Sequence, residues 1–120
     1  MEKSIEEQQF EVLQSADEYI VKLINGINMY MSNIKEREYD EALNLLSYIL
    51  EGIDWLNEVV RLTKDIQKEN MDEELMKKQL EKISEYLNIE DYDRISKLLY
   101  EGILPLLNTW KDVIKKSIAF

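Results

Sequence analysis

The sequence predicts an all-α fold, an antiparallel up-down-up-down four-helix bundle in which residues 1–120 form a single domain. The first observation is that only four residues are Gly or Pro, so the chain has few of the signals that end strands and form hairpins. The second is that apolar residues recur at spacings of three and four over long stretches. Because short polar segments separate these stretches, neighbouring helices should pack antiparallel.

The first predicted helix begins at Ser4, where Ser4 and Glu7 have the spacing of a capping box. Its apolar stripe consists of Phe10, Leu13, Ile20, Ile24, Ile27, Met31 and Ile34. Asp17 interrupts the stripe. Because a buried, unpaired carboxylate is costly, we expect Ala16 to face the core and Asp17 to lie at the rim. The alternative is that Asp17 faces a binding partner.

The second and third predicted helices follow short polar segments. Asp40 is the expected N-cap of the second helix, which runs to about Lys68. Its core stripe consists of Ala42, Leu46, Ile49, Ile53, Leu56 and Val60. Asn70, with Glu73 three positions later, predicts the start of a shorter third helix. The apolar residues of that helix are Leu75, Met76, Leu80, Ile83 and Leu87.

Asn88, with Asp91 three positions later, repeats this capping pattern before the fourth predicted helix. The apolar residues of this helix are Ile95, Leu98, Leu99, Ile103, Leu106, Leu107, Trp110, Val113 and Ile114. Pro105 lies inside it, lacks an amide hydrogen and crowds the carbonyl four residues earlier. We therefore expect a kink near Leu104, with a full break into two helices as the alternative.

The composition excludes most familiar catalytic chemistry. Without His or Cys, the chain has no conventional zinc site, thiol nucleophile or Ser-His-Asp triad. We therefore predict no catalytic residues, no metal and no cofactor, and hence no enzyme. A net charge of −10 opposes binding to nucleic acid or to anionic membranes. The chain has no apolar run of membrane-spanning length and an acidic beginning in place of a signal peptide, so we expect a cytoplasmic protein.

The second predicted helix has another apolar stripe beside its core stripe, formed by Leu45, Tyr48, Gly52, Trp55, Val59, Leu62 and Ile66. Gly52 would leave a notch between two aromatic residues of the kind that dominate binding hot spots. One interpretation is a groove that receives an amphipathic helix, with Tyr48, Gly52, Trp55, Val59 and Leu62 as its partner-binding residues. The alternative is that the helix is central and buries both stripes within the bundle.

The segment from Leu106 to Ile114 reads Leu-Leu-Asn-Thr-Trp-Lys-Asp-Val-Ile and follows an acidic turn at residues 90–93. It resembles the closing helix of bacterial flagellar export chaperones of the FliS type, and the likeness covers about a quarter of the chain. Those chaperones, and the related FliT type, are small acidic cytoplasmic bundles that hold flagellin or the filament cap protein until export. The resemblance implies a chaperone-like role with a protein client.

These observations lead to two hypotheses of function. The first is a non-enzymatic protein-binding module, an adaptor or an export-chaperone-like protein that holds an amphipathic helical segment of a partner. The second is a structural homo-oligomer that buries the same stripe against a second copy of the chain.

Overall fold

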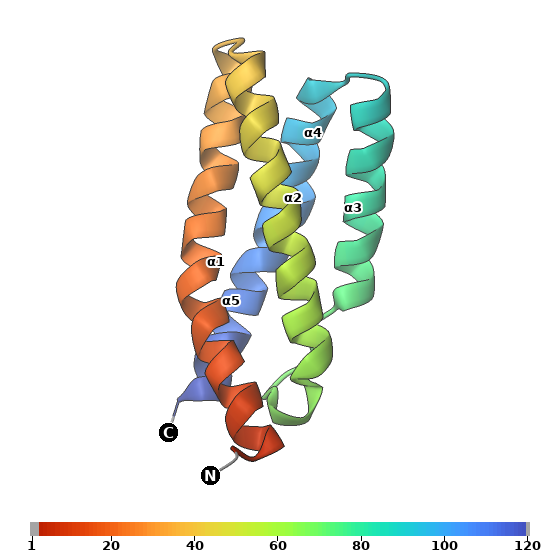
Figure 1. Ribbon diagram of the computed structural model, residues 1–120. Coiled ribbons are helices and arrows are strands. Elements are labelled where there is room, and N and C mark those ends of the chain that lie inside the picture. The colour runs from red at the N-terminus through yellow and green to blue at the C-terminus, as the bar shows by residue number, and fades with distance from the viewer. Residues whose placement is uncertain (1–2, 120) are drawn as a thin grey trace.

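The computed structural model describes residues 3–119, and almost all of them are helical (Figure 1). No strand occurs within this range. The elements are α1 (Ile5–Lys35), α2 (Tyr39–Leu62), the 3₁₀ turn η1 (Lys64–Ile66), α3 (Glu73–Asn88), α4 (Tyr92–Leu98), the π-helical turn η2 (Leu99–Ile103) and α5 (Leu104–Ile118). Because α4, η2 and α5 follow one another without interruption, the chain has four long helical segments. The all-α prediction is confirmed.

The helices form an elongated bundle of 51 × 23 × 22 Å. Figure 1 shows that the chain runs upward in α1, returns in α2, runs upward again in α3 and descends through α4 and α5. Helix α1 packs against α2 and α5, whereas α3 packs against α2 and α4. As expected, α3 is the shortest of the four segments, with 16 residues.

The core follows the apolar stripes closely in α2 and less closely in the other helices. All six predicted core residues of α2 are buried. In α1 the buried residues are Leu13, Ala16, Ile20, Leu23, Ile27, Tyr30 and Ile34. Phe10, Ile24 and Met31, which the stripe included, are only half-buried. The spacing of three and four in α1 is a seven-residue repeat, which keeps one seam against its neighbours over the whole helix.

The prediction for Asp17 is confirmed. Ala16 is fully buried, and the Asp17 side chain lies at the rim, where Oδ1 is 3.5 Å from the Lys115 Nζ. In α3 only Met76 and Ile83 are buried. Leu75, another apolar residue of this helix, is 40% exposed, because α3 buries a narrow face against α2 and α4.

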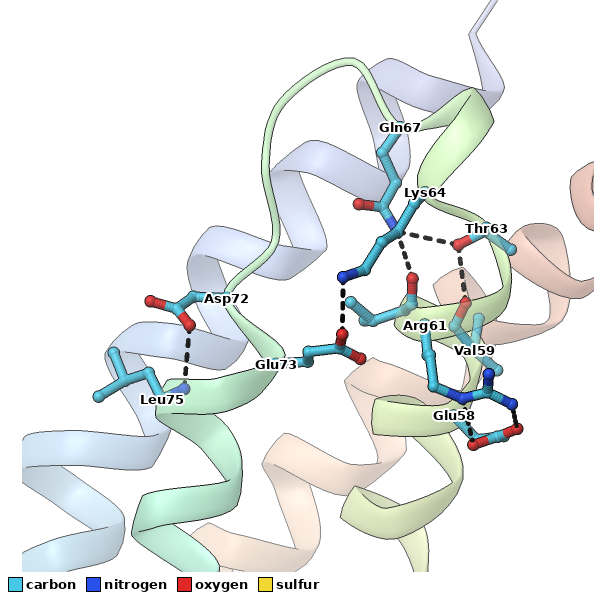
Figure 2. Close-up of polar contacts among 10 residues, drawn as sticks. Glu58, Val59, Arg61, Thr63, Lys64, Gln67, Asp72, Glu73 and Leu75 are labelled. Atoms are coloured by element: carbon cyan, nitrogen blue, oxygen red, sulfur yellow. Dashed lines mark hydrogen bonds and ion pairs between the residues drawn. The ribbon is translucent and has the colours of Figure 1, made fainter.

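Helix α2 ends earlier than the sequence indicated. It ends at Leu62 rather than near Lys68, because polar side chains donate hydrogen bonds to carbonyl groups in its last turn. The Thr63 hydroxyl donates to the Val59 carbonyl at 2.7 Å, and the Gln67 side-chain amide donates to the Val60 carbonyl at 2.7 Å (Figure 2). These bonds replace the helical pattern beyond Leu62.

Three predicted N-caps were placed on the wrong residue. Helix α2 begins at Tyr39 after Glu38, so Asp40 lies within its first turn. Asp72, not Asn70, caps α3 by accepting from the Leu75 amide at 2.9 Å (Figure 2). Asp91, not Asn88, caps α4 by accepting from the Arg94 amide at 3.1 Å. In both cases a carboxylate lies at the positive end of the helix dipole, where its charge stabilises the helix.

The cap of the first helix was placed correctly. The Ser4 hydroxyl oxygen accepts from the Glu7 amide at 3.1 Å.

The turns after α1 and α3 share one geometry. Arg37 and Glu90 have φ values of 61° and 55°, in the left-handed region. Beyond them, the Glu38 amide donates to the Asn33 carbonyl at 2.8 Å, and the Asp91 amide donates to the Tyr86 carbonyl at 2.9 Å. These are Schellman motifs, in which glycine is the usual left-handed residue.

Replacing Arg37 or Glu90 by glycine should therefore stabilise the protein. Each change should raise the free energy of unfolding by about 0.5–1 kcal/mol, because it removes the steric penalty of a side chain at positive φ. Urea denaturation followed by circular dichroism measures the change. Alanine at the same positions is the control, since it removes the charge and keeps the Cβ. Equal stabilisation by alanine and glycine would show that backbone strain is not the cause.

The last segment was expected to kink near Leu104, and the irregularity found there is the π-helical turn η2, which ends two residues before Pro105. The Leu104 amide donates to the carbonyl of Leu99, five residues earlier rather than four. This wider turn accommodates Pro105, which has no amide hydrogen to donate. Because residues 92–118 stay helical, the alternative of a full break is wrong.

Candidate partner-binding surface

The structure divides the second apolar stripe into buried, half-buried and exposed residues, and the half-buried ones are Leu45 and Ile66. Gly52 and Val59 are buried, whereas Tyr48, Trp55 and Leu62 are 71%, 39% and 51% exposed. The exposed residues are seven positions apart, which places them in one row with a separation of about 10 Å along the helix. The interpretation that α2 buries both stripes is therefore correct for Gly52 and Val59 and wrong for the three larger residues.

The notch predicted at Gly52 is occupied by this chain's own α1. A Cβ built at Gly52 would collide with the Tyr19 hydroxyl and would lie 3.0 Å from Cζ of the same ring. The Tyr19 ring also packs edge-on against Trp55, with 5.4 Å between the ring centroids and an angle of 76°. Gly52 thus allows Tyr19 to approach α2 and to support one side of the Trp55 ring.

A shallow groove lies between α1 and α2, and Tyr19 lines it. Its larger part is a hollow of about 350 Å³ between α1 and α2, lined by Tyr19, Tyr48, Glu51, Gly52 and Trp55. A second hollow, of about 120 Å³, shares Tyr19 and Tyr48 with the first and reaches Lys22, Gly26 and Leu45. We call these two hollows and their lining residues the α1–α2 groove. Of the five predicted site residues, Tyr48, Gly52 and Trp55 line it.

Leu62 and Val59 do not line the α1–α2 groove. Leu62 continues the exposed row of Tyr48 and Trp55 toward the end of α2, and Val59 belongs to the core. Sequence reasoning missed Tyr19 as a groove residue. The available signal was its position beside the core stripe, seven residues before Gly26, on the helix that must pack antiparallel to Gly52.

Two ion pairs lie near the start of α1 and the end of α2. The Arg61 guanidinium donates to the Glu58 carboxylate and lowers the pKa of that group (Figure 2). Lys3 pairs with Glu11 at 2.7 Å, and the hydrogen bond to Glu11 raises the pKa of Lys3. At the opposite end, desolvation and the neighbouring Glu36 and Glu41 raise the pKa of Glu38.

Between residues 3 and 119, no three acidic side chains come together in an arrangement that could hold a metal ion. In the same range, no helix has the length and apolar character needed to cross a membrane.

The model of a family described as a domain of unknown function, DUF8042, matches residues 11–113. The chain belongs to the DUF8042 family. The matched region of this DUF8042 protein includes the whole α1–α2 groove and most of the core. No curated protein and no solved structure matches the chain significantly. The resemblance to flagellar export chaperones therefore stays a prediction.

The two glycines of the groove should respond differently to alanine. At Gly26 a Cβ would meet only the Ile49 side chain, at 3.8 Å, so Gly26→Ala should stabilise the protein by about 0.5–1 kcal/mol through helix propensity. Gly52→Ala must displace Tyr19 from Trp55. The strained rotamer and the lost ring contact should leave this variant about 1 kcal/mol less stable than Gly26→Ala.

Urea denaturation compares the two glycine variants. Tryptophan fluorescence, measured with Trp110→Phe in both variants so that Trp55 is the one tryptophan left, reports the movement of Tyr19. Equal stabilisation with unchanged fluorescence would show that Tyr19 does not depend on Gly52.

Proposed function

We propose that this protein is a non-enzymatic protein-binding module, an adaptor or an export-chaperone-like protein, whose α1–α2 groove holds an amphipathic helical segment of a partner. The observation that carries the proposal is the exposed row of Tyr48, Trp55 and Leu62 beside the groove. Helix α2 already has a complete buried stripe facing the bundle, so the fold itself does not require large apolar side chains at these three positions.

The geometry suits a helix better than an extended peptide. The described residues are helical and offer no strand edge to which an extended chain could pair. A row of apolar side chains repeating every seven residues matches the repeat of a helix laid alongside α2. Tyr19 already packs against the Trp55 ring, so less side-chain freedom is lost when a partner covers the exposed part of that ring.

The proposal predicts that Trp55→Ala weakens partner binding by about 2 kcal/mol, roughly 30-fold, because a large, partly supported aromatic surface is lost. The tagged protein would be isolated from its native host, and the proteins recovered with wild type and with Trp55→Ala would be compared by quantitative mass spectrometry. The affinity for any partner that is lost would then be measured with purified proteins.

A matched control is available outside the groove. Tyr100 is 66% exposed, close to the 71% of Tyr48, but lies in η2 away from the groove. Tyr48→Ala should weaken binding and Tyr100→Ala should not. A partner that binds both Tyr48→Ala and Trp55→Ala as well as wild type would contradict the proposal. Recovery of only the protein itself, lost in Trp55→Ala, would favour the homo-oligomer.

A further inference from the structure

The charges around the α1–α2 groove are mostly negative. Glu51 lines the larger hollow. Glu41 is seven residues before Tyr48 and therefore lies in the exposed row of α2. On α1, Glu18 is four residues before Lys22, which lines the smaller hollow, so Glu18 is on the same side of the helix. All three carboxylates are exposed.

These three carboxylates, Glu18, Glu41 and Glu51, have no ion-pair partner within residues 3–119, and we call them the acidic rim. Glu11 and Glu58, on the same two helices, are not part of the acidic rim, because Glu11 pairs with Lys3 and Glu58 pairs with Arg61. Among the lining residues of the two hollows, Glu51 is the single anion and Lys22 the single cation. The excess of negative charge beside the apolar row therefore comes from Glu18 and Glu41, which follow the lining residues along α1 and α2.

On the basis of the proposed function, we infer that the occupant of the groove is a basic amphipathic helix, with Lys or Arg on both sides of its apolar stripe. Such a helix covers Tyr48 and Trp55 with apolar side chains and places its cations against the acidic rim. A second copy of the chain fits less well. Each copy has a net charge of −10, and groove-to-groove contact would bring two acidic rims together.

Two model peptides test this inference on the full-length protein. Both are designed helices of about five turns with the same stripe of leucines seven residues apart. One has Lys on both sides of the stripe and the other has Glu. Affinity is measured by fluorescence anisotropy at low and at high salt. The Lys peptide should bind, the Glu peptide should not, and salt should weaken the complex because exposed charges are screened.

Protein variants distinguish attraction of the Lys peptide to the acidic rim from its general attraction to an acidic protein. Glu18→Gln with Glu51→Gln removes two charges from the acidic rim. Glu81→Gln with Glu85→Gln removes two charges from exposed positions on α3 and is the matched control. The rim variant should lose about fivefold in affinity for the Lys peptide, as expected for two exposed ion pairs, and the control should change less than twofold. Trp55→Ala should also weaken the complex.

Each of the other outcomes overturns the inference. Equal binding of the two peptides, lost in Trp55→Ala, would keep the proposed function and reject the basic occupant. Equal weakening by the rim and control variants would mean general attraction to an acidic protein. Failure of the Lys peptide to bind would reject a basic helix as the occupant. The co-purification experiment would still test the proposed function. A dimer in analytical ultracentrifugation that is lost in Trp55→Ala would make a second copy the occupant.

Discussion

Trp110→Ala is expected to lower the free energy of unfolding by about 3–5 kcal/mol, because it leaves a large cavity in the core. Trp110 is fully buried in α5, which packs against α1. Urea denaturation followed by circular dichroism measures the loss. The matched control is Trp55→Ala, which removes the same side chain from a position that is 39% exposed. This variant should lose about 1 kcal/mol or less.

Because a loss of this size can unfold a small domain, Trp110→Phe is a second variant for the same prediction. Phenylalanine fills most of the cavity and has no indole N–H. In the described part of the chain, the Trp110 Nε1 has no hydrogen-bond partner, so its removal breaks no hydrogen bond. Trp110→Phe should therefore recover more than half of the lost stability. Similar losses in Trp110→Ala and Trp55→Ala would contradict the burial of Trp110.

A second expected result is loss of stability above pH 10. Burial, followed by the nearby Tyr92 and Asp93, raises the pKa of Tyr30 well above its ordinary value of 10.0. Below pH 10 the phenol is protonated in both the folded and the unfolded chain, so it contributes no pH dependence. Above pH 10 the unfolded chain loses this proton and the folded chain keeps it. The free energy of unfolding should then fall by about 1.4 kcal/mol per pH unit from this group.

Tyr30→Phe isolates the contribution of this tyrosine, because it keeps the ring and removes the titrating group. Within residues 3–119 the hydroxyl makes one long hydrogen bond, to the Tyr92 carbonyl at 3.3 Å, so the variant should lose little stability at pH 7. Between pH 10 and 12, denaturation curves of the variant should lack the added slope. If wild type and Tyr30→Phe show the same slope, other groups cause the alkaline instability.

The all-α fold and the core of α2 could be predicted from the sequence because both depend on local patterns. The six core residues of α2 lie on one face whichever neighbours the helix has. The exposure of the second stripe could not be predicted, since it depends on which helices pack beside α2. Val59 became part of the core and Trp55 stayed at the surface although both belong to the same stripe.

Tyr19 and the two left-handed turns show a different limit. The space left by Gly52 is filled by a residue 33 positions earlier, and only the packing of α1 against α2 brings the two together. Arg37 and Glu90 adopt a conformation for which glycine is the usual signal, so neither turn could be recognised by composition. The end of α2 was missed because Thr63 and Gln67 end it without Gly or Pro.

The π-helical turn η2 changes the spacing of the buried residues in the last helical segment. Ile95, Leu99, Ile103 and Leu107 are all buried although each is four residues after the last. In a regular α-helix, three such steps would rotate the final side chain about 120° away from the first. The π-helical turn compensates for this rotation because it holds one additional residue.

The additional residue can be recognised from the spacing of the buried side chains. If the exposed Tyr100 were deleted, the spacing from Ile95 to Ile114 would become four, three, four, three and four, the same repeat that the buried residues of α2 follow. The last helical segment is thus a regular seven-residue repeat with a one-residue insertion, and Pro105 follows two residues after the turn that accommodates this insertion.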